Sequence, residues 1–69
     1  MNKNEQEMLN KIIEVVVKYD RINENLRKMA REARENYLFK LADELDKIVR
    51  VNDRELAQYK RILNAKRGE

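Results

Sequence analysis

The side chains of this sequence that could do chemistry are carboxylates, amines, guanidinium groups and phenols. Ser, Thr, His, Cys, Trp and Pro are absent, and the single Gly is Gly68. These absences remove the hydroxyl and thiol nucleophiles, the histidine general base and most ligands of transition metals. A catalytic Lys, Tyr, Asp or Glu would need a pocket that shifts its pKa, and a small helical chain seldom builds one. We therefore expect a protein that is not an enzyme.

The densest group of carboxylates is Asp43, Glu44 and Asp46. Their oxygen atoms could surround a hard cation, but di-iron helical bundles combine Glu with His at a fixed spacing, and the chain has no His. The aromatic residues recur at helical spacings that are typical of core and boundary positions rather than of a cofactor site. The sequence thus predicts no metal, no cofactor and no small-molecule ligand.

Basic residues form two clusters, one in the middle of the chain and one in its tail. They include Arg27, Lys28, Arg31, Arg34, Lys60 and Arg61. Such clusters can neutralise the phosphates of a nucleic acid. They also have simpler roles, because the tail cluster complements the carbonyl end of the last helix and the middle one keeps a bundle soluble. No aromatic residue interleaves them to stack on bases. A small basic nucleic-acid-binding regulator is therefore the alternative function, and it is not favoured.

Size and composition indicate one small domain over residues 1–69. The chain has a mass of 8.4 kDa, 42% charged residues and a formal net charge of only +3. No apolar run approaches the ~20 residues of a membrane span, so we expect a soluble, cytoplasmic protein with no membrane partner. The amino-acid composition favours helix formers over turn residues, as a protein designer might choose and as some natural chains also show. Both origins, natural and designed, stay open.

The stretch IIEVVVKY, residues 12–19, fits two structures. As a strand it places four apolar side chains on one face, and as a helix it continues a stripe of eight apolar residues. That stripe consists of Met8, Ile12, Val15, Tyr19, Ile22, Leu26, Met29 and Ala33. Five β-branched residues in a helix cost about 2–3 kcal/mol, which two buried members of the stripe offset. We predict a helix. The strand would need a dimer that pairs its strands, as in ribbon-helix-helix repressors that bind DNA.

Capping residues predict where the helices begin. Asn4 with Glu7 predicts a first helix from about residue 5, and Asn52 with Glu55 predicts a last helix from about residue 53. Between them the stretch RENYLF, residues 34–39, is the expected reversal, because Asn36 tolerates the left-handed conformation that a turn often needs. Alternatively, Asn52 is a buried polar residue within one continuous helix, where it would set the register.

The expected fold is all-α. It is an antiparallel helical hairpin or three-helix arrangement, in which a long first helix is followed by two helices nearly in line. The predicted packing interface consists of Met8, Ile12, Val15, Val16, Tyr19, Ile22, Leu26, Met29, Leu38, Leu41, Leu45 and Ile48. A lone hairpin would leave one side of this apolar surface in water, whereas two hairpins cover each other. We therefore expect a homodimeric four-helix bundle, and its rival is a compact three-helix monomer.

The core register of the first helix, with Lys3 and Asn10 on its outer side, resembles that of the Rop family of plasmid copy-number proteins. The resemblance covers most of the chain and implies a homodimeric four-helix bundle whose one face binds paired RNA loops. Two features differ, since Glu14 stands where that family has an aromatic residue and the short acidic turn near residue 30 is missing. No binding residue is therefore carried over. The favoured function is a structural or interaction module that acts through helix packing and self-association.

Overall fold

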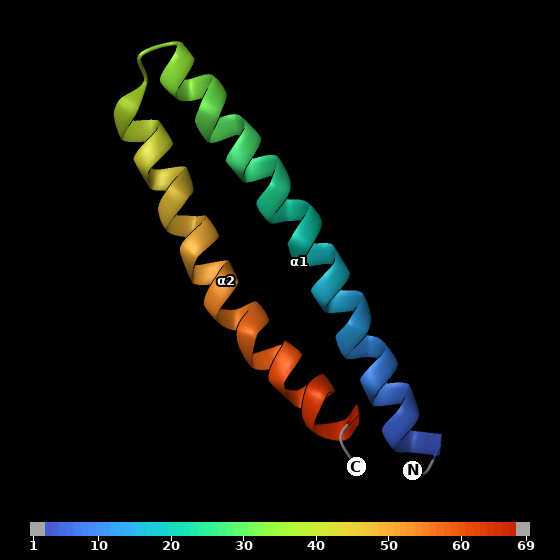
Figure 1. Cartoon of the computed structure of the whole chain (residues 1–69). Helices are drawn as coiled ribbons and strands as arrows, with labels where there is room; N and C mark the ends of the chain where they lie inside the picture. The colour runs from blue at the N-terminus through green and yellow to red at the C-terminus, as the bar shows by residue number, and fades with distance from the viewer. Residues whose placement is uncertain (1–2, 68–69) are drawn as a thin grey trace.

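The computed structural model describes residues 3–67 and consists of two helices joined by a short turn. Helix α1 spans Lys3–Glu35 and helix α2 spans Phe39–Arg67. The two helices lie side by side in opposite directions, so that both open ends lie at one end of the molecule (Figure 1). The resulting rod measures 52 × 15 × 13 Å. The all-α class and the antiparallel hairpin are confirmed, and no strand occurs within residues 3–67.

Residues 12–19 lie wholly within α1, so the helical prediction for IIEVVVKY is confirmed and the strand alternative is wrong. The reason is the spacing of apolar residues on both sides of this stretch. Ile12 and Tyr19, seven residues apart, are half-buried on the side of α1 that faces α2. Burial of this long helical face outweighs the modest preference of Val and Ile for strands.

The second half of the chain is one continuous helix, so the predicted break near residue 53 and the three-helix arrangement are wrong. Asn52 caps nothing and lies in the middle of α2, where its amide donates a hydrogen bond to Asn23 of α1. This bond satisfies the side chain without interrupting the backbone ladder of α2, which a helix start would have broken. At the other terminus α1 already includes Lys3, so Asn4 lies in its first turn and not at the predicted cap.

The reversal falls within RENYLF as predicted, but its left-handed residue is Tyr37 (φ 62°) and not Asn36. The amide of Leu38 donates to the carbonyl of Ala33 (2.8 Å), and that of Tyr37 donates to the carbonyl of Arg34 (3.0 Å). This pair of bonds is a Schellman motif, which closes a helix on a residue with positive φ. The side chain of Asn36 contributes by donating to the carbonyl of Glu32 (2.8 Å).

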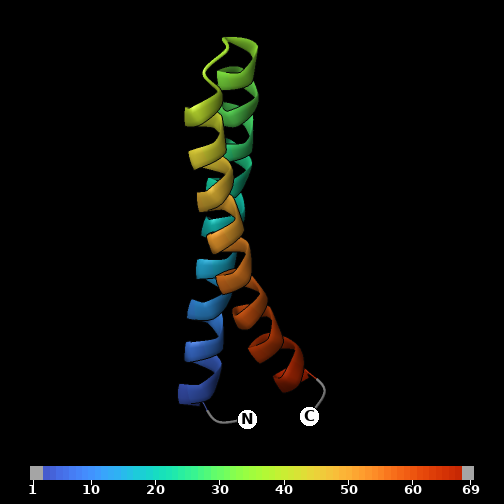
Figure 2. The same ribbon diagram turned by 90° about the vertical axis from the view of Figure 1, so that its left-hand side faces the viewer.

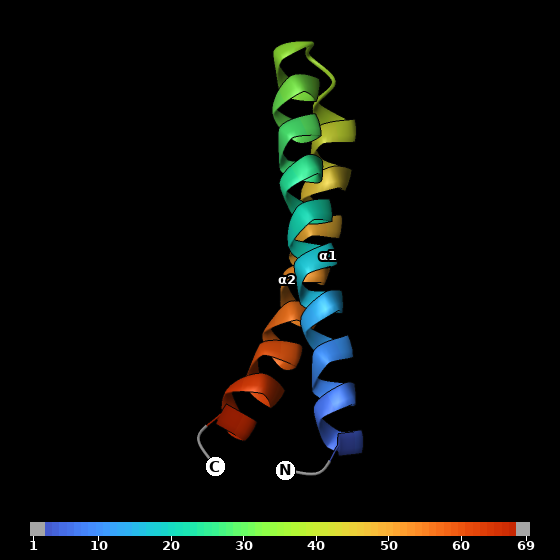
Figure 3. The same ribbon diagram turned by 90° about the vertical axis from the view of Figure 1, so that its right-hand side faces the viewer.

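The helices meet along a seam in which buried and half-buried residues recur at alternating spacings of three and four. On α1 the seam comprises Leu9, Ile12, Val16, Tyr19, Asn23, Leu26, Ala30 and Ala33. On α2 it comprises Ala42, Leu45, Val49, Asn52, Leu56, Tyr59 and Leu63. A strict seven-residue repeat of this kind requires two helices to coil around each other with a left-handed twist. Figures 2 and 3 show this crossing, with the open ends of α1 and α2 diverging in the side views.

The seam lies one residue to the side of the predicted apolar stripe. It shares with the stripe Ile12, Tyr19, Leu26 and Ala33, but its other members on α1 are Leu9, Val16, Asn23 and Ala30. The seam is difficult to recognise in the sequence because its position 23 is the polar Asn23, whereas the neighbouring Ile22 continues the predicted apolar stripe. The alanines of the seam lie near the turn, where small side chains allow a close approach of the two helices.

Candidate functional site

A polar layer crosses the middle of the seam. The side chain of Asn23 is 1% exposed, and its Nδ2 donates to Oδ1 of Asp53 (2.9 Å). Its Oδ1 accepts from Nδ2 of Asn52 (2.9 Å), and Arg27 donates to both carboxylate oxygens of Asp53 (3.4 and 3.3 Å). No buried side-chain polar atom among the described residues lacks a partner. A satisfied polar pair of this kind selects one register of the two helices, at some cost in stability.

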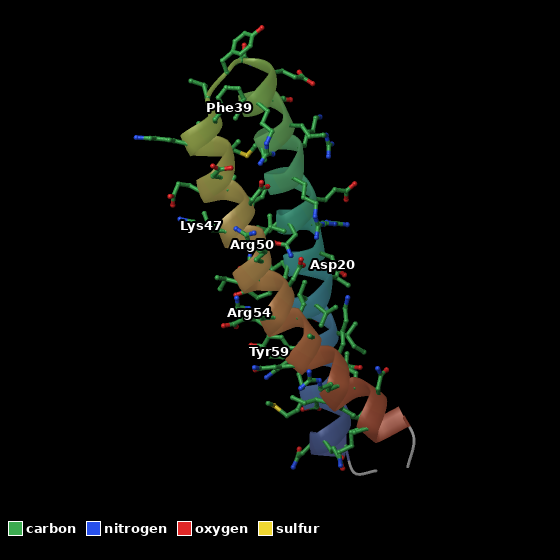
Figure 4. All side chains as sticks on the ribbon, turned by 60° about the vertical axis from the view of Figure 1, so that its left-hand side comes forward. Asp20, Phe39, Lys47, Arg50, Arg54 and Tyr59 are labelled. Atoms are coloured by element: carbon green, nitrogen blue, oxygen red, sulfur yellow. The ribbon has the colours of Figure 1, made fainter. Side chains whose placement is uncertain are left out.

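One long side of the hairpin is lined by ion pairs between the helices, and we call it the ion-paired flank. Arg34 pairs with Asp46 and with Asp43 (3.6 Å). Farther from the turn Arg27 pairs with Asp53 (3.3 Å), and Lys60 pairs with Asp20 (3.9 Å). Figure 4 shows Asp20 on α1 beside α2. The positions recur every seven residues on each helix, as expected for the residues that border one side of an antiparallel seam.

Two of the ion pairs shift pKa values. The hydrogen bond from Arg34 to Asp46 raises the pKa of the guanidinium. At the open end of the hairpin, Nζ of Lys66 lies 2.6 Å from Oε1 of Glu5, and this hydrogen bond lowers the pKa of the Glu5 carboxyl. Exposed pairs of this kind contribute little to stability, because water screens the two charges. These ion pairs therefore lie on a side of the hairpin that faces water, and they contribute little to holding the two helices together.

The opposite long side carries exposed apolar side chains, and we call it the apolar flank. Its members are Met8, Val15, Ile22 and Met29 of α1 and Leu41, Ile48 and Ile62 of α2. All but the half-buried Val15 are exposed. They too recur every seven residues, directly beside the seam, and only Glu55 of α2 interrupts the series. One side of the seam is thus bordered mainly by charged side chains, with Ile13 as the exception, and the other mainly by apolar side chains, with Glu55 as the exception.

Near the turn the apolar flank is hollowed into a shallow groove between the two helices. The groove is lined by Met29, Glu32, Ala33, Asn36, Leu38, Leu41 and Leu45. Met29 and Leu41 thus lie on the same side of the hairpin although they come from different helices. Beyond the groove, Tyr37 and Phe39 form an edge-to-face pair at the turn, with ring centroids 6.3 Å apart. Figure 4 places Phe39 at this end of the rod.

The twelve residues of the predicted packing interface divide between two surfaces. Ile12, Val16, Tyr19, Leu26 and Leu45 belong to the seam. Met8, Val15, Ile22, Met29, Leu41 and Ile48 lie together on the apolar flank, and Leu38 lies in the turn at its end. The predicted interface omitted the other buried residues, namely Leu9, Asn23, Ala30, Ala33, Ala42, Val49 and Leu56. Their seven-residue spacing was visible in the sequence, but alanines and an asparagine give a weak apolar signal.

Three of the six predicted nucleic-acid residues form ion pairs between the two helices. Arg27, Arg34 and Lys60 lie on the ion-paired flank, where aspartates neutralise them. The remaining three, Lys28, Arg31 and Arg61, are exposed, and Arg31 lies one helical turn from both Arg27 and Arg34. Binding of RNA or DNA through these six residues together stays a prediction that their geometry does not strengthen.

The carboxylates of the predicted acidic cluster point to different partners. Asp43 and Asp46 both pair with Arg34, whereas Glu44 pairs with Lys47 (3.4 Å). Within residues 3–67 no three acidic side chains converge as metal ligands would.

In the same range no helix is long and apolar enough to cross a membrane.

Comparison of the chain with protein-family models, curated proteins and solved structures found no match.

Proposed function

We propose that the chain is a non-enzymatic interaction module that forms a homodimeric four-helix bundle by pairing two apolar flanks. The observation that carries this proposal is the difference between the two long sides of the hairpin. Both sides border the same seam at equivalent positions of the seven-residue repeat. On one side these positions hold ion pairs between the helices, and on the other they hold exposed Met, Ile and Leu side chains.

The total exposed surface supports the same proposal. A compact folded monomer of 8.4 kDa exposes about 4,600 Å². The hairpin exposes 5800 Å². The excess of about 1,200 Å² exceeds the ~800 Å² that each partner buries in a typical stable interface. A second copy on the apolar flank would therefore bring the exposed surface per chain down to the range of stable small proteins.

The seam alone contains little of the apolar bulk of the chain. Its larger buried apolar side chains are Leu9, Leu45, Val49 and Leu56, and the other buried apolar residues are alanines. Six members of the apolar flank, each about half exposed, carry as much hydrocarbon again. An exposed apolar surface of several hundred square ångströms on a small protein marks an interaction site. The apolar flank is formed by two helices, so a second pair of helices can pack on it with the side-chain ridges of one pair in the grooves of the other.

Sedimentation equilibrium of purified chain tests the proposal. We expect a dimer at micromolar concentration, and we expect Ile22→Glu on the apolar flank to shift it to monomer. The matched control is Ile13→Glu, because Ile13 is on the same helix and is 46% exposed, against 45% for Ile22, but lies outside the apolar flank. The control should leave the dimer intact. A wild-type chain that stays monomeric at these concentrations would overturn the proposal.

A further inference from the structure

The outer face of α2, opposite the seam, carries basic residues along most of the helix. Four of them recur every seven residues, and the fifth lies one turn from two of the others. They are Lys40, Lys47, Arg50, Arg54 and Arg61, all exposed, and we call them the basic stripe. Because an α-helix rises about 1.5 Å per residue, the stripe extends over about 32 Å. Figure 4 shows Lys47, Arg50 and Arg54 following one another along α2.

Carboxylates lie beside the basic stripe only near the turn. There Glu44 pairs with Lys47 (3.4 Å), and Asp43 pairs with Arg34 of α1 (3.6 Å). Farther along, the other residues of the outer face are uncharged, and they are Val51, Ala57, Gln58, Asn64 and Ala65. The part of the stripe from Arg50 onward is therefore a surface with positive charge only.

The three arginines of the stripe form no ion pair with any described residue. The nearby carboxylates of α2 belong to Asp53 and Glu55, which lie on the ion-paired flank and on the apolar flank. The guanidinium groups of Arg50, Arg54 and Arg61 thus face water, and their N–H donors are available to an external anion.

The outer face of α1 does not share this character. Its residues opposite the seam, at the same seven-residue spacing, are Glu7, Glu14, Arg21, Lys28 and Glu35. An extended anion along α1 would be attracted at two of these positions and repelled at three. The five charges of the basic stripe also exceed the formal net charge of +3, so the rest of the chain is slightly acidic. The positive potential is thus concentrated on one face of one helix.

A nucleic-acid duplex complements this surface better than other polyanions do. The stripe lies on a convex helix of about 10–12 Å diameter, and the major groove of DNA, about 12 Å wide, admits such a helix between two rows of phosphates. Arginines bind phosphate oxygens through two parallel hydrogen bonds. Insertion into a lipid surface would need large apolar side chains on the same face, and single-stranded nucleic acid would need aromatic ones. Among its exposed residues the outer face of α2 offers only Val51 for the first purpose.

We propose that the outer face of α2 binds double-stranded DNA through its phosphates, with Arg50, Arg54 and Arg61 as the main contacts. Contacts to phosphates carry no sequence information, so binding is independent of base sequence. The basic stripe is separate from the apolar flank, and the proposal therefore does not depend on the homodimer.

Fluorescence anisotropy of a labelled duplex of about 20 base pairs tests the proposal. Three neutralised phosphates should make log K fall with log salt with a slope of about −3. A triple variant with Arg50→Gln, Arg54→Gln and Arg61→Gln should raise the Kd at least tenfold and flatten this slope. Two duplexes of unrelated sequence should bind equally well.

The matched control removes the same charge from the outer face of α1. Arg21→Gln, Lys28→Gln and Arg31→Gln replace three exposed cations that form no ion pair with a described residue, and they should change the Kd less than threefold. Circular dichroism checks that both triple variants remain helical. Equal losses in the two variants would mean that net charge alone attracts DNA, and they would overturn the proposal. Absence of binding at low salt, equal binding of single strands, or tighter binding to phosphatidylserine vesicles would also overturn it.

Discussion

Asn52 donates a hydrogen bond of 2.9 Å to Asn23, an asparagine that is 1% exposed and lies directly across the seam. Both polar atoms of the Asn23 side chain therefore have a partner, because its Nδ2 donates to Asp53. In a hairpin held together mostly by alternating apolar residues, this pair distinguishes one register from registers shifted by a whole heptad.

The first prediction concerns this pair. Asn52→Ala should lower the free energy of unfolding by about 1–2 kcal/mol, because it leaves Oδ1 of Asn23 unpaired in the seam. Urea denaturation followed by circular dichroism measures the change. Gln58→Ala, at an exposed position of the same helix, is the control and should change stability little. Equal effects of the two substitutions would show that the hydrogen bond is not important for stability.

Replacing both asparagines should have the opposite effect. Asn23→Leu combined with Asn52→Leu removes every buried polar group that needs a partner in this layer and adds apolar burial, so thermal stability should rise. The cost should be specificity, visible as a mixture of oligomers in sedimentation velocity. A double variant that is more stable and still uniform would show that register is set elsewhere.

The third prediction concerns the ion-paired flank. A double-mutant cycle with Arg34→Gln and Asp46→Asn should give a small coupling energy, because both side chains are partly exposed. The coupling should decrease further as salt rises from 0.05 to 0.5 M, roughly as screening predicts. Arg31→Gln, a nearby arginine outside this flank, should show no salt-dependent loss. A large coupling energy that salt does not weaken would mean that this flank, and not the seam, holds the hairpin.

The fourth prediction concerns pH. Lys66 lowers the pKa of Glu5 from its ordinary value of 4.5, so the folded chain binds the Glu5 proton more weakly than the unfolded chain does. The stabilising contribution of this pair is therefore fully present above pH 4.5 and is lost as the pH falls through the lowered folded-state pKa. An NMR titration should place the Glu5 midpoint below 4.5, and Lys66→Gln should move it upward. A midpoint that Lys66→Gln leaves unchanged would contradict the assignment.

The fifth prediction concerns the turn. Tyr37 is 81% exposed and has a positive φ that favours glycine. Tyr37→Gly should raise the free energy of unfolding by about 0.5–1 kcal/mol, since the strain removed exceeds the entropy lost and the weak contact with Phe39. Tyr37→Phe keeps both the strain and the ring and should be neutral. Thermal unfolding of the three chains measures the order, and a less stable glycine variant would mean that the Tyr37 ring is needed.

Helical class, antiparallel direction and the place of the turn could be predicted from the sequence because each depends on many residues at once. The apolar stripe around residues 12–19 and the apolar residues from Leu38 onward each extend over several turns of helix. The break near residue 53 was wrong because a capping pair is a local signal, and Asn52 has a better partner thirty residues away in Asn23. Sequence spacing contains no information on that partner until the register is known.

The two flanks illustrate the same limit. The ion pair between Asp46 and Arg34 joins two different helices, so the spacing of residues within one helix does not reveal it. Likewise, the apolar residues of the predicted interface could be named, but not divided into those that meet within the hairpin and those left exposed. That division depends on how each helix is rotated about its own axis, and in the structure this rotation buries Asn23 in place of Ile22.

The return of α2 alongside α1 brings Lys3 and Arg67 to the same pole of the rod, far from Tyr37 (Figure 1). Any domain or tag fused to either helix end would therefore emerge at one pole, and the turn would project away from it by the length of the rod. The single hairpin is therefore polar along its axis, with both helix ends at one pole and the Tyr37–Phe39 pair at the other.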